Sequence, residues 1–248
     1  MHRRIGCFGI GVQKAGTTSL FSLLRQHREL AAPSRKELHF FDDETRDWST
    51  PDYDAIEPWF QASGPGLRFD ITPIYCYWPQ SMERIQRYDP SARLIILFRD
   101  PFHRAWSHWC MQYARGLERL TFAEALHMEP ERMGAPHQAQ ERRFFSYVDR
   151  GRYGSQMRRL LTLFPREQIL ALCAEDLRQD QAGTLKRVAA FLDIGLFPSL
   201  LPAREHRRPD ITYPKMPGAD ERALVYAMLR HEMEELAGLT DGQIHYVE

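Results

Sequence analysis

Short apolar runs alternate with amphipathic stretches along most of the 248 residues. Four runs have the length of a strand, and they cover residues 5–11, 67–71, 93–98 and 168–173. Strands that alternate with helices are typical of a parallel sheet covered by helices. The sequence therefore predicts an α/β fold with three layers, in which helices flank a central, mostly parallel sheet.

The amphipathic stretches supply the predicted helices, because their apolar residues recur at helical intervals. They cover residues 17–26, 105–113, 153–164, 180–192 and 221–236. Two further stretches, 128–141 and 195–219, contain several prolines or glycines, and we expect irregular connections there. No internal repeat or low-complexity segment is visible, and the length suits a single α/β domain spanning residues 1–248.

The charged residues balance, with 33 Lys and Arg against 33 Asp and Glu. A protein that binds nucleic acid or an anionic membrane through its overall field needs a basic excess, so the sequence predicts neither partner. Any bound anion must instead meet a local cluster of cations. Only four of the 33 basic residues are lysines, and they are Lys14, Lys36, Lys186 and Lys215.

The cysteines and the lengths of the apolar runs indicate the compartment. Cys7, Cys76, Cys110 and Cys173 are scattered, without a Cys-x-x-Cys pair or a His pair at metal spacing. We therefore expect reduced thiols, no metal site and a cytoplasmic protein. No run reaches the roughly 18 apolar residues of a membrane span, and the first run is too short for a signal peptide, so we expect no membrane insertion.

The loop at residues 9–18 joins the first predicted strand to the first predicted helix through small residues. Backbone N–H groups at such a helix start bind phosphate or sulfate. Gly11 and Gly16 have the spacing of the phosphate loop of nucleotide triphosphatases, but Thr17 replaces the lysine after the second glycine, and Lys14 lies inside the loop. The alternative is a tight turn in which glycine and threonine only cap the helix.

A second departure concerns magnesium. A triphosphate enzyme places a carboxylate for Mg²⁺ at the end of a second strand. Here the predicted strand 93–98 is followed first by a cation, Arg99. The sequence thus predicts a P-loop-like cradle that works without magnesium and without a β,γ-phosphate.

The chain carries four motifs, which are GVQKAGTTSL at 11–20, KELHFFD at 36–42, DITPIY at 70–75 and RLIILFRDPFHRAWS at 93–107. With these motifs in this order, the chain resembles the sulfotransferases that use 3′-phosphoadenosine 5′-phosphosulfate (PAPS). The resemblance is strongest to the heparan sulfate branch, with its N-deacetylase/N-sulfotransferase and 3-O types, and extends from about residue 5 to residue 110. It implies a P-loop-NTPase-like fold, PAPS as co-substrate, adenosine 3′,5′-bisphosphate as product, and no metal.

The resemblance also implies a donor site. Lys14 would contact the donor's 5′-phosphate oxygens and stabilise the charge of the leaving group. The other residues implied for this loop are Ala15, Gly16, Thr17, Thr18 and Ser19. Arg99 and Ser107 match the residues that hold the 3′-phosphate. The C-terminal loop of the family aligns only loosely, and Arg207, Arg208 or Lys215 would replace its cations. The alternatives are an ion pair between Arg99 and its neighbour Asp100 and, for the C-terminal loop, solvated charge.

The resemblance implies that Glu37 is the catalytic base, since it stands where this branch keeps that residue. The reaction needs a base because an acceptor hydroxyl must lose its proton as it bonds to sulfur. Sulfuryl transfer would then be direct and in line. In an extended segment His39 would point the same way as Glu37, and it could orient the acceptor or share the proton. The residues assigned to the acceptor side are His39, Asp42, Asp70 and Tyr75. The alternatives are a solvated ion pair between Lys36 and Glu37 and a capping role for Asp42.

The chain departs from the heparan type at Ile71, where those enzymes carry a lysine next to the acidic residue. This departure argues against an acidic glycan, and we expect a hydroxyl of a small molecule, a lipid or a sugar. Aromatic side chains that either line an acceptor pocket or pack in the core are Trp48, Trp59, Tyr75, Trp78 and Trp109. Two other functions stay open, a nucleotide kinase with an atypical phosphate loop and a nucleotide-binding protein without catalysis.

Overall fold

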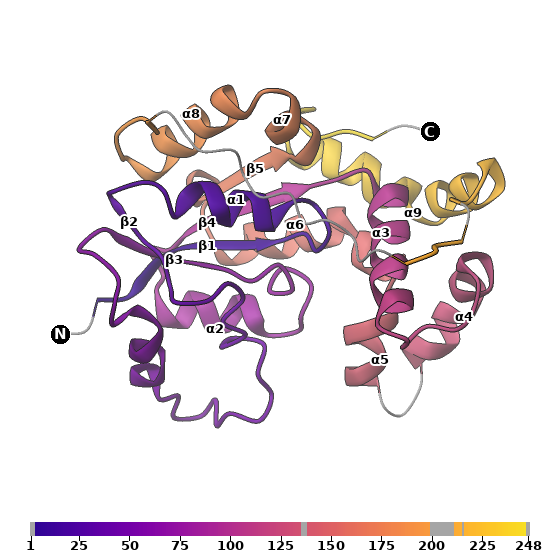
Figure 1. Cartoon of the computed structure of the whole chain (residues 1–248), viewed down its shortest axis with the longest axis horizontal. Helices are drawn as coiled ribbons and strands as arrows, with labels where there is room; N and C mark the ends of the chain where they lie inside the picture. Colours follow the sequence, from indigo (N-terminus) through magenta and orange to yellow (C-terminus); the bar gives the residue numbers. More distant parts are fainter. Residues whose placement is uncertain (1–2, 135–137, 199–210, 215, 247–248) are drawn as a thin grey trace. The chain divides into compact units, whose positions relative to one another are not determined.

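The computed structural model describes residues 3–134, 138–198, 211–214 and 216–246 (Figure 1). Its described strands form one sheet in the order β2-β3-β1-β4-β5, and every neighbouring pair is parallel. The strands are β1 Ile5–Gly11, β2 Leu30–Ala31, β3 Leu67–Ile71, β4 Arg93–Phe98 and β5 Ile169–Cys173. Helices flank this sheet, so the predicted α/β fold is confirmed.

The contacts divide the chain into two compact units. The first comprises residues 1–98 and 159–206 and contains the whole sheet, and the second comprises residues 99–158 and 207–248. The second unit is helical in the part that the structure describes. The interpretation of the chain as a single domain stays a prediction.

The helices of the first unit include α1 Thr17–Leu24, α2 Ser81–Tyr88, α7 Ala174–Gln179 and α8 Gln181–Leu192. Those of the second unit include α3 Pro101–Ala114, α4 Phe122–Gly134, α5 Gln138–Phe145 and α9 Ala219–Leu239. Helix α6, Tyr153–Leu163, begins in the second unit and ends in the first. Three 3₁₀-helices are described, which are η1 Tyr53–Phe60, η2 Asp149–Gly151 and η3 Arg166–Gln168. All five predicted helices are present, with ends that differ by a few residues.

The irregular connection predicted for 128–141 is largely wrong. Helix α4 continues through Pro130 to Gly134, and α5 begins at Gln138. A proline inside a helix removes one hydrogen bond, but packing elsewhere can offset that loss. The buried carboxylate of Glu129 supplies such an anchor, because it accepts hydrogen bonds from the backbone N–H groups of Val148 and Asp149 at 2.7–2.9 Å.

The segment after β3 packs closely against the carboxyl end of the central strand β1. Thr72 N donates to Gly9 O and Cys76 N to Ile10 O, both at 3.0 Å. A Cβ atom added to Gly11 would overlap the sulfur of Cys76. The absence of a side chain at Gly11 therefore lets the segment 72–76 lie directly against the end of β1.

We expect Gly11→Ala to lower the free energy of unfolding by about 1–3 kcal/mol, because the new methyl group overpacks this contact. Urea denaturation followed by circular dichroism measures the change. The control is Gly64→Ala, since a Cβ at Gly64 meets nothing within 4 Å and should change stability by less than about 0.5 kcal/mol. Equal stability of the two variants would contradict the packing argument.

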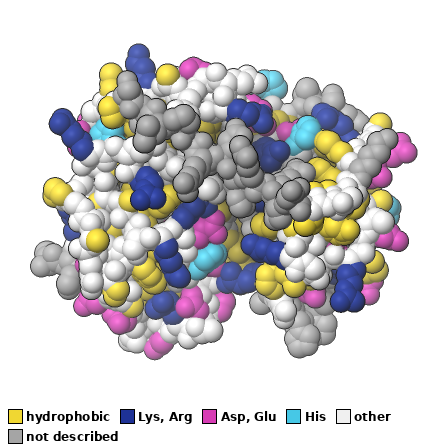
Figure 2. Space-filling model, viewed as in Figure 1, with side chains coloured by type: hydrophobic (Ala, Val, Ile, Leu, Met, Phe, Trp, Pro, Cys, Tyr) yellow, Lys and Arg dark blue, Asp and Glu magenta, His cyan; other side chains and the backbone are white. Residues whose placement is uncertain are grey.

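The thiols are reduced, and charges of both signs mix on the face that is drawn in Figure 2. The four cysteines are free, and Cys7, Cys76 and Cys110 are buried. On that face, Lys and Arg side chains are interspersed with Asp and Glu. None of the helices in the described ranges is long and apolar enough to span a membrane.

Candidate active site

The loop between β1 and α1 is held by a hydrogen bond to β4 at its start and by one within the loop. Val12 N donates to Leu97 O of β4 at 2.8 Å, and Ala15 N donates to Val12 O at 3.2 Å. Two residues adopt left-handed backbone angles, Lys14 with φ 73° and Gly16 with φ 91°. Gly16 then serves as the N-cap of α1. The first N–H groups of a helix have no partner within it, and together with the helix dipole they favour a bound anion.

The side chains of this loop divide into two groups. Those of Lys14, Thr18 and Ser19 are partly exposed, whereas Ala15 and Thr17 are buried. The predicted donor residues therefore differ in what they can offer. Gly16 and Thr17 offer backbone N–H groups, whereas the N–H of Ala15 already donates to Val12 O. The partly exposed side chains offer a cation and hydroxyl groups.

The segment 36–42 carries the predicted catalytic residues and forms neither helix nor strand. Glu37 and His39 have left-handed backbone angles, with φ 61° and φ 54°. Their side chains are 38% and 45% exposed, while Leu38 and Phe40 are buried. Glu37 and His39 thus share one side of the segment, as expected, but the backbone that places them there is not the extended one assumed from the sequence.

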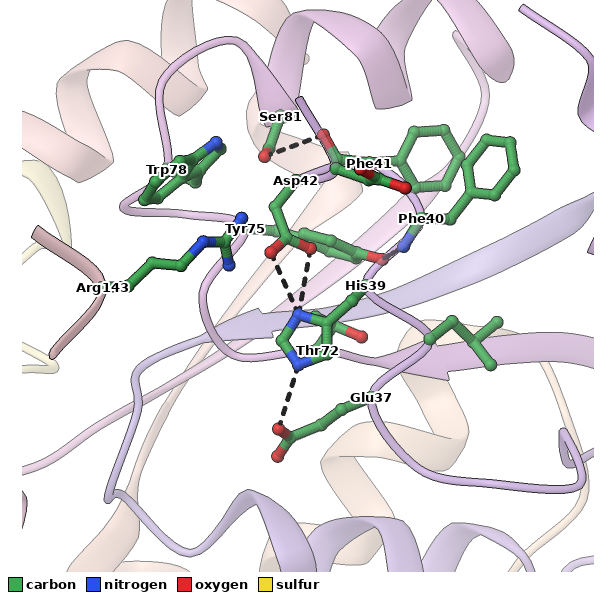
Figure 3. Close-up of polar contacts among 12 residues, drawn as sticks. Glu37, His39, Phe40, Phe41, Asp42, Thr72, Tyr75, Trp78, Ser81 and Arg143 are labelled. Carbon is green, nitrogen blue, oxygen red and sulfur yellow. Dashed lines mark hydrogen bonds and ion pairs between the residues drawn. The ribbon is translucent and has the colours of Figure 1, made fainter. Parts of the chain in front are cut away.

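A chain of polar contacts runs through this segment (Figure 3). His39 Nδ1 lies 3.0 Å and 3.1 Å from the two carboxylate oxygens of Asp42, and His39 Nε2 lies 3.5 Å from Glu37 Oε2. The ammonium group of Lys36 pairs with the other oxygen of Glu37. The imidazole of His39 is therefore held between two carboxylates, of which Asp42 is buried.

The charges in this chain shift the protonation of both central residues. Burial raises the pKa of Glu37, but the hydrogen bond to His39 and the charge of Lys36 outweigh it and lower the pKa to about 2. The hydrogen bond to Asp42, followed by that to Glu37, raises the pKa of His39 to about 9. At neutral pH the site therefore holds a carboxylate at Glu37 and an imidazolium at His39.

We expect the pKa of the His39 ring to be about 9 rather than the ordinary histidine value of about 6.5. Because the folded-state pKa is raised, the stabilisation that His39 contributes is fully present below pH 6.5 and is lost as the pH rises through about 9. NMR titration of the histidine ring protons measures this, with Asp42→Asn expected to lower the pKa of His39. A midpoint near 6.5 in the unmodified protein would contradict the arrangement.

Asp70 and Tyr75 lie behind this segment and are fully buried. Asp70 accepts hydrogen bonds from the hydroxyls of Thr72 and Tyr75, both at 2.8 Å, and from Leu38 N at 3.4 Å. Burial raises the pKa of Asp70 to about 6, although the hydrogen bonds counteract it. Neither side chain presents surface to a substrate here, so the acceptor contacts assigned to them stay a prediction.

The residues implied for the donor's 3′-phosphate belong to the second unit. Arg99 directly follows β4, and its carbonyl accepts a hydrogen bond from the buried hydroxyl of Tyr153 at 3.0 Å. Asp100 caps α3 by accepting from His103 N at 2.7 Å. Ser107 lies about two turns into α3 and is buried. Arg207, Arg208 and Lys215 lie outside the described residues.

The aromatic residues proposed for an acceptor pocket behave differently from one another. Tyr75, Trp78 and Trp109 are buried, which favours the packing alternative for them. Trp48 and Trp59 are partly exposed, and both rings contact the buried ring of Phe40, with centroids 5.8 Å and 6.5 Å away. No group of three His, Cys, Asp or Glu side chains suited to a metal occurs among the residues described.

The loop that is predicted to bind phosphate and the carboxylate of Glu37, which His39 contacts, lie on one α/β unit. A family model for the sulfotransferase domain matches residues 7–204. The chain belongs to the sulfotransferase family.

Curated relatives come from the heparan sulfate branch of the sulfotransferases. The human heparan sulfate glucosamine 3-O-sulfotransferases 3B1 and 3A1 are each 30% identical over 190 residues, or 75% of this chain. The alignments cover 45% and 43% of those proteins, so the chain matches less than half of their length. The resemblance identified from the four motifs is thereby confirmed.

Solved structures of other sulfotransferases share the fold. A sulfotransferase from Alicyclobacillus acidocaldarius is 25% identical with a TM-score of 0.78, and the match covers 98% of both chains. A sulfotransferase domain from the curacin biosynthetic pathway, 18% identical with a TM-score of 0.55, agrees in fold over 99% of this chain and 94% of its own.

Proposed function

We propose that this sulfotransferase moves the sulfuryl group of PAPS to an acceptor hydroxyl in one direct, in-line step, with Glu37 as the general base. The observation that carries the proposal is the carboxylate of Glu37, which is ionised, partly exposed and held by His39 and Lys36. A general base must be unprotonated, accessible and fixed in direction, and Glu37 meets these requirements.

The positions of the loop and the base within the first unit support this function. Strands β1 and β3 are parallel neighbours, so the loop after β1 and the segment after β3 leave the same edge of the sheet. Thr72 N, just after β3, donates a hydrogen bond to Gly9 O near the end of β1. Asp70, within β3, accepts a hydrogen bond from Leu38 N, the residue after Glu37. The phosphate loop and the base thus flank one short segment of chain.

Each chemical event has a residue to serve it. The acceptor oxygen forms a bond to sulfur while the bond from sulfur to the 5′-phosphate oxygen breaks, and adenosine 3′,5′-bisphosphate leaves with the electron pair. Lys14 and the N–H groups at the start of α1 stabilise the charge on that leaving group. Arg99 and Ser107 hold the 3′-phosphate, and no metal takes part.

The hydroxyl proton passes to Glu37. A carboxylate with a pKa of about 2 is a weak base for a free alcohol, but the hydroxyl becomes strongly acidic as its oxygen bonds to sulfur. His39, itself fixed by Asp42, keeps the Glu37 carboxylate in one orientation. In this assignment Glu37 is the catalytic residue, and His39 positions it and contacts the acceptor.

The acceptor we propose is a hydroxyl of a small molecule, a lipid or a sugar. The curated relatives are named for heparan sulfate glucosamine, but this chain has a buried isoleucine at position 71, where the resemblance to those enzymes implies a lysine. Trp48 and Trp59 are partly exposed, their rings contact Phe40 of the catalytic segment, and an indole ring suits a sugar or aryl face. The free thiols are typical of a reducing compartment, which supports a cytoplasmic location.

Calorimetric titration with adenosine 3′,5′-bisphosphate tests the donor site, and labelled PAPS with a panel of neutral hydroxyl acceptors tests transfer. We expect binding of the bisphosphate without magnesium and transfer to at least one acceptor. Binding of ATP with magnesium in place of the bisphosphate would favour the kinase alternative. Bisphosphate binding without turnover of any acceptor would favour a nucleotide-binding protein.

A further inference from the structure

Glu37, the proposed base, and His39, which positions it, are each followed by a residue whose backbone amide donates a hydrogen bond to a buried side chain. Leu38 N donates to Asp70 Oδ1 at 3.4 Å. Phe40 N donates to the hydroxyl oxygen of Tyr75 at 3.2 Å. The side chains of Leu38 and Phe40 are also buried, so backbone and side chain anchor the segment at the same two residues.

The two anchors converge on one carboxylate. The hydroxyl of Tyr75 accepts from Phe40 N and donates to Asp70 Oδ2 at 2.8 Å. Asp70 therefore holds Leu38 directly and Phe40 through Tyr75, one carboxylate oxygen serving each. Figure 3 shows the ring of Tyr75 lying behind the segment, with its hydroxyl toward the backbone of Phe40.

The carboxylate is itself fixed by the sheet. Asp70 is the penultimate residue of β3 and pairs with Phe8 of the central strand β1. Its side chain is fully buried and also accepts from the hydroxyl of Thr72 at 2.8 Å. A buried carboxylate that accepts three hydrogen bonds has little freedom to move. Asp70 therefore holds segment 37–40 in a fixed position relative to the sheet.

The segment needs such an anchor because its backbone is strained. Glu37 and His39 both have φ in the left-handed region, which residues with a Cβ atom adopt rarely. Strained conformations persist where the surrounding structure fixes them, and they concentrate at functional sites. If the amides of Leu38 and Phe40 were released, the segment would relax, and Glu37 and His39 would change direction.

We propose that Asp70 and Tyr75 are positioning residues of the transfer reaction, which hold segment 37–40 in the strained conformation that presents Glu37 and His39 to the acceptor. The catalytic half of this inference rests on the proposed function. In this role the two buried residues act on the reaction through the backbone amides of Leu38 and Phe40, in place of the acceptor contacts that the sequence predicts for them. Their removal should therefore slow transfer and leave donor binding unchanged.

Tyr75→Phe is the most selective test, because it removes one hydroxyl and keeps the buried ring. We expect kcat to fall about 10- to 100-fold, the cost of a misplacement on the order of 1 Å, with the dissociation constant for adenosine 3′,5′-bisphosphate within twofold. Asp70→Asn should have at least the same effect. Because both residues act through one path, the double variant should lose little more than Asp70→Asn alone.

The matched control is Tyr88→Phe. Tyr88 is a buried tyrosine of the same unit whose hydroxyl also accepts from a backbone amide, Ile5 N at 2.8 Å, but at the opposite end of β1. The control loses the same kind of hydrogen bond and should keep kcat within twofold. Equal losses of kcat in Tyr88→Phe and Tyr75→Phe, or unchanged kcat in Tyr75→Phe, would overturn the proposal, as would additive losses in the double variant.

Amide hydrogen exchange gives a readout that does not depend on turnover. We expect the amides of Leu38 and Phe40 to exchange at least tenfold faster in Asp70→Asn, and that of Phe40 in Tyr75→Phe, while Tyr88→Phe leaves both unchanged. If the unmodified protein transfers sulfuryl to no acceptor, the proposed function fails, yet the exchange rates still decide whether Asp70 and Tyr75 anchor the segment. Unchanged exchange in Asp70→Asn would refute the anchor even in an active enzyme.

Discussion

Glu37→Gln is expected to lower kcat by about 10²- to 10⁴-fold, the usual range for the loss of a general base. The amide has nearly the same size as the carboxylate but cannot take the proton of the acceptor hydroxyl. It also cannot form the ion pairs that the carboxylate makes with Lys36 and with the imidazolium of His39. Since the side chain of Glu37 is 38% exposed, we expect the fold and bisphosphate binding to survive the change.

Single-turnover transfer from labelled PAPS measures this effect, because it isolates the chemical step from product release. The matched control is Glu167→Gln, an exposed glutamate of η3 in the same unit, which should keep full activity. A fully active Glu37→Gln protein would remove Glu37 from the mechanism. His39 would then be examined as the group that takes the proton, at a pH above its raised pKa of about 9.

Lys14→Ala is expected to lower kcat by about 10²- to 10³-fold, as the loss of one preorganised electrostatic contact typically does. Lys14 lies in the loop between β1 and α1, where its left-handed backbone angle of φ 73° is part of the tight turn. Its ammonium group is assigned to the oxygen that departs from sulfur, where negative charge grows during the step. Binding of the bisphosphate product should weaken as well, because that charge is fully developed there.

Lys186→Ala provides the control, since Lys186 is an exposed lysine of α8 in the same unit. Both variants lose one positive charge, so a difference between them reports position rather than net charge. Measurements at two salt concentrations separate the local contact from general attraction of an anionic donor. If Lys14→Ala matched Lys186→Ala in kcat, the leaving-group assignment would be wrong.

The fold was largely readable from the sequence because the sheet is buried. Strands β1, β3 and β4 appear as apolar runs, and their predicted bounds match the structure. Strand β2 has only two residues, too few for a periodic signal. Helix α2 was missed although Met82, Ile85 and Tyr88 recur at helical spacing. Helix α4 was also missed, because Pro130 and Gly134 favoured an irregular connection and the anchoring by Glu129 depends on the folded chain.

The sequence singles out individual residues of the candidate site but does not predict how they contact one another. Glu37, His39 and Asp42 were each singled out, yet their mutual contacts depend on left-handed angles at Glu37 and His39 that no local preference predicts. The role of Asp70 and Tyr75 was hidden for a different reason. Their bonds join segments about 32 and 35 residues apart, and only the folded sheet brings those segments together.

Because Glu37 and His39 have left-handed backbone angles, substitutions there that raise stability are expected to lower turnover. Each such angle costs a residue with a Cβ atom roughly 1–2 kcal/mol, and glycine would avoid that cost. A selection for heat resistance alone would therefore tend to replace the two side chains that the proposed reaction needs. Stabilised versions of this enzyme should be sought by changing other parts of the chain, with positions 37 and 39 kept constant.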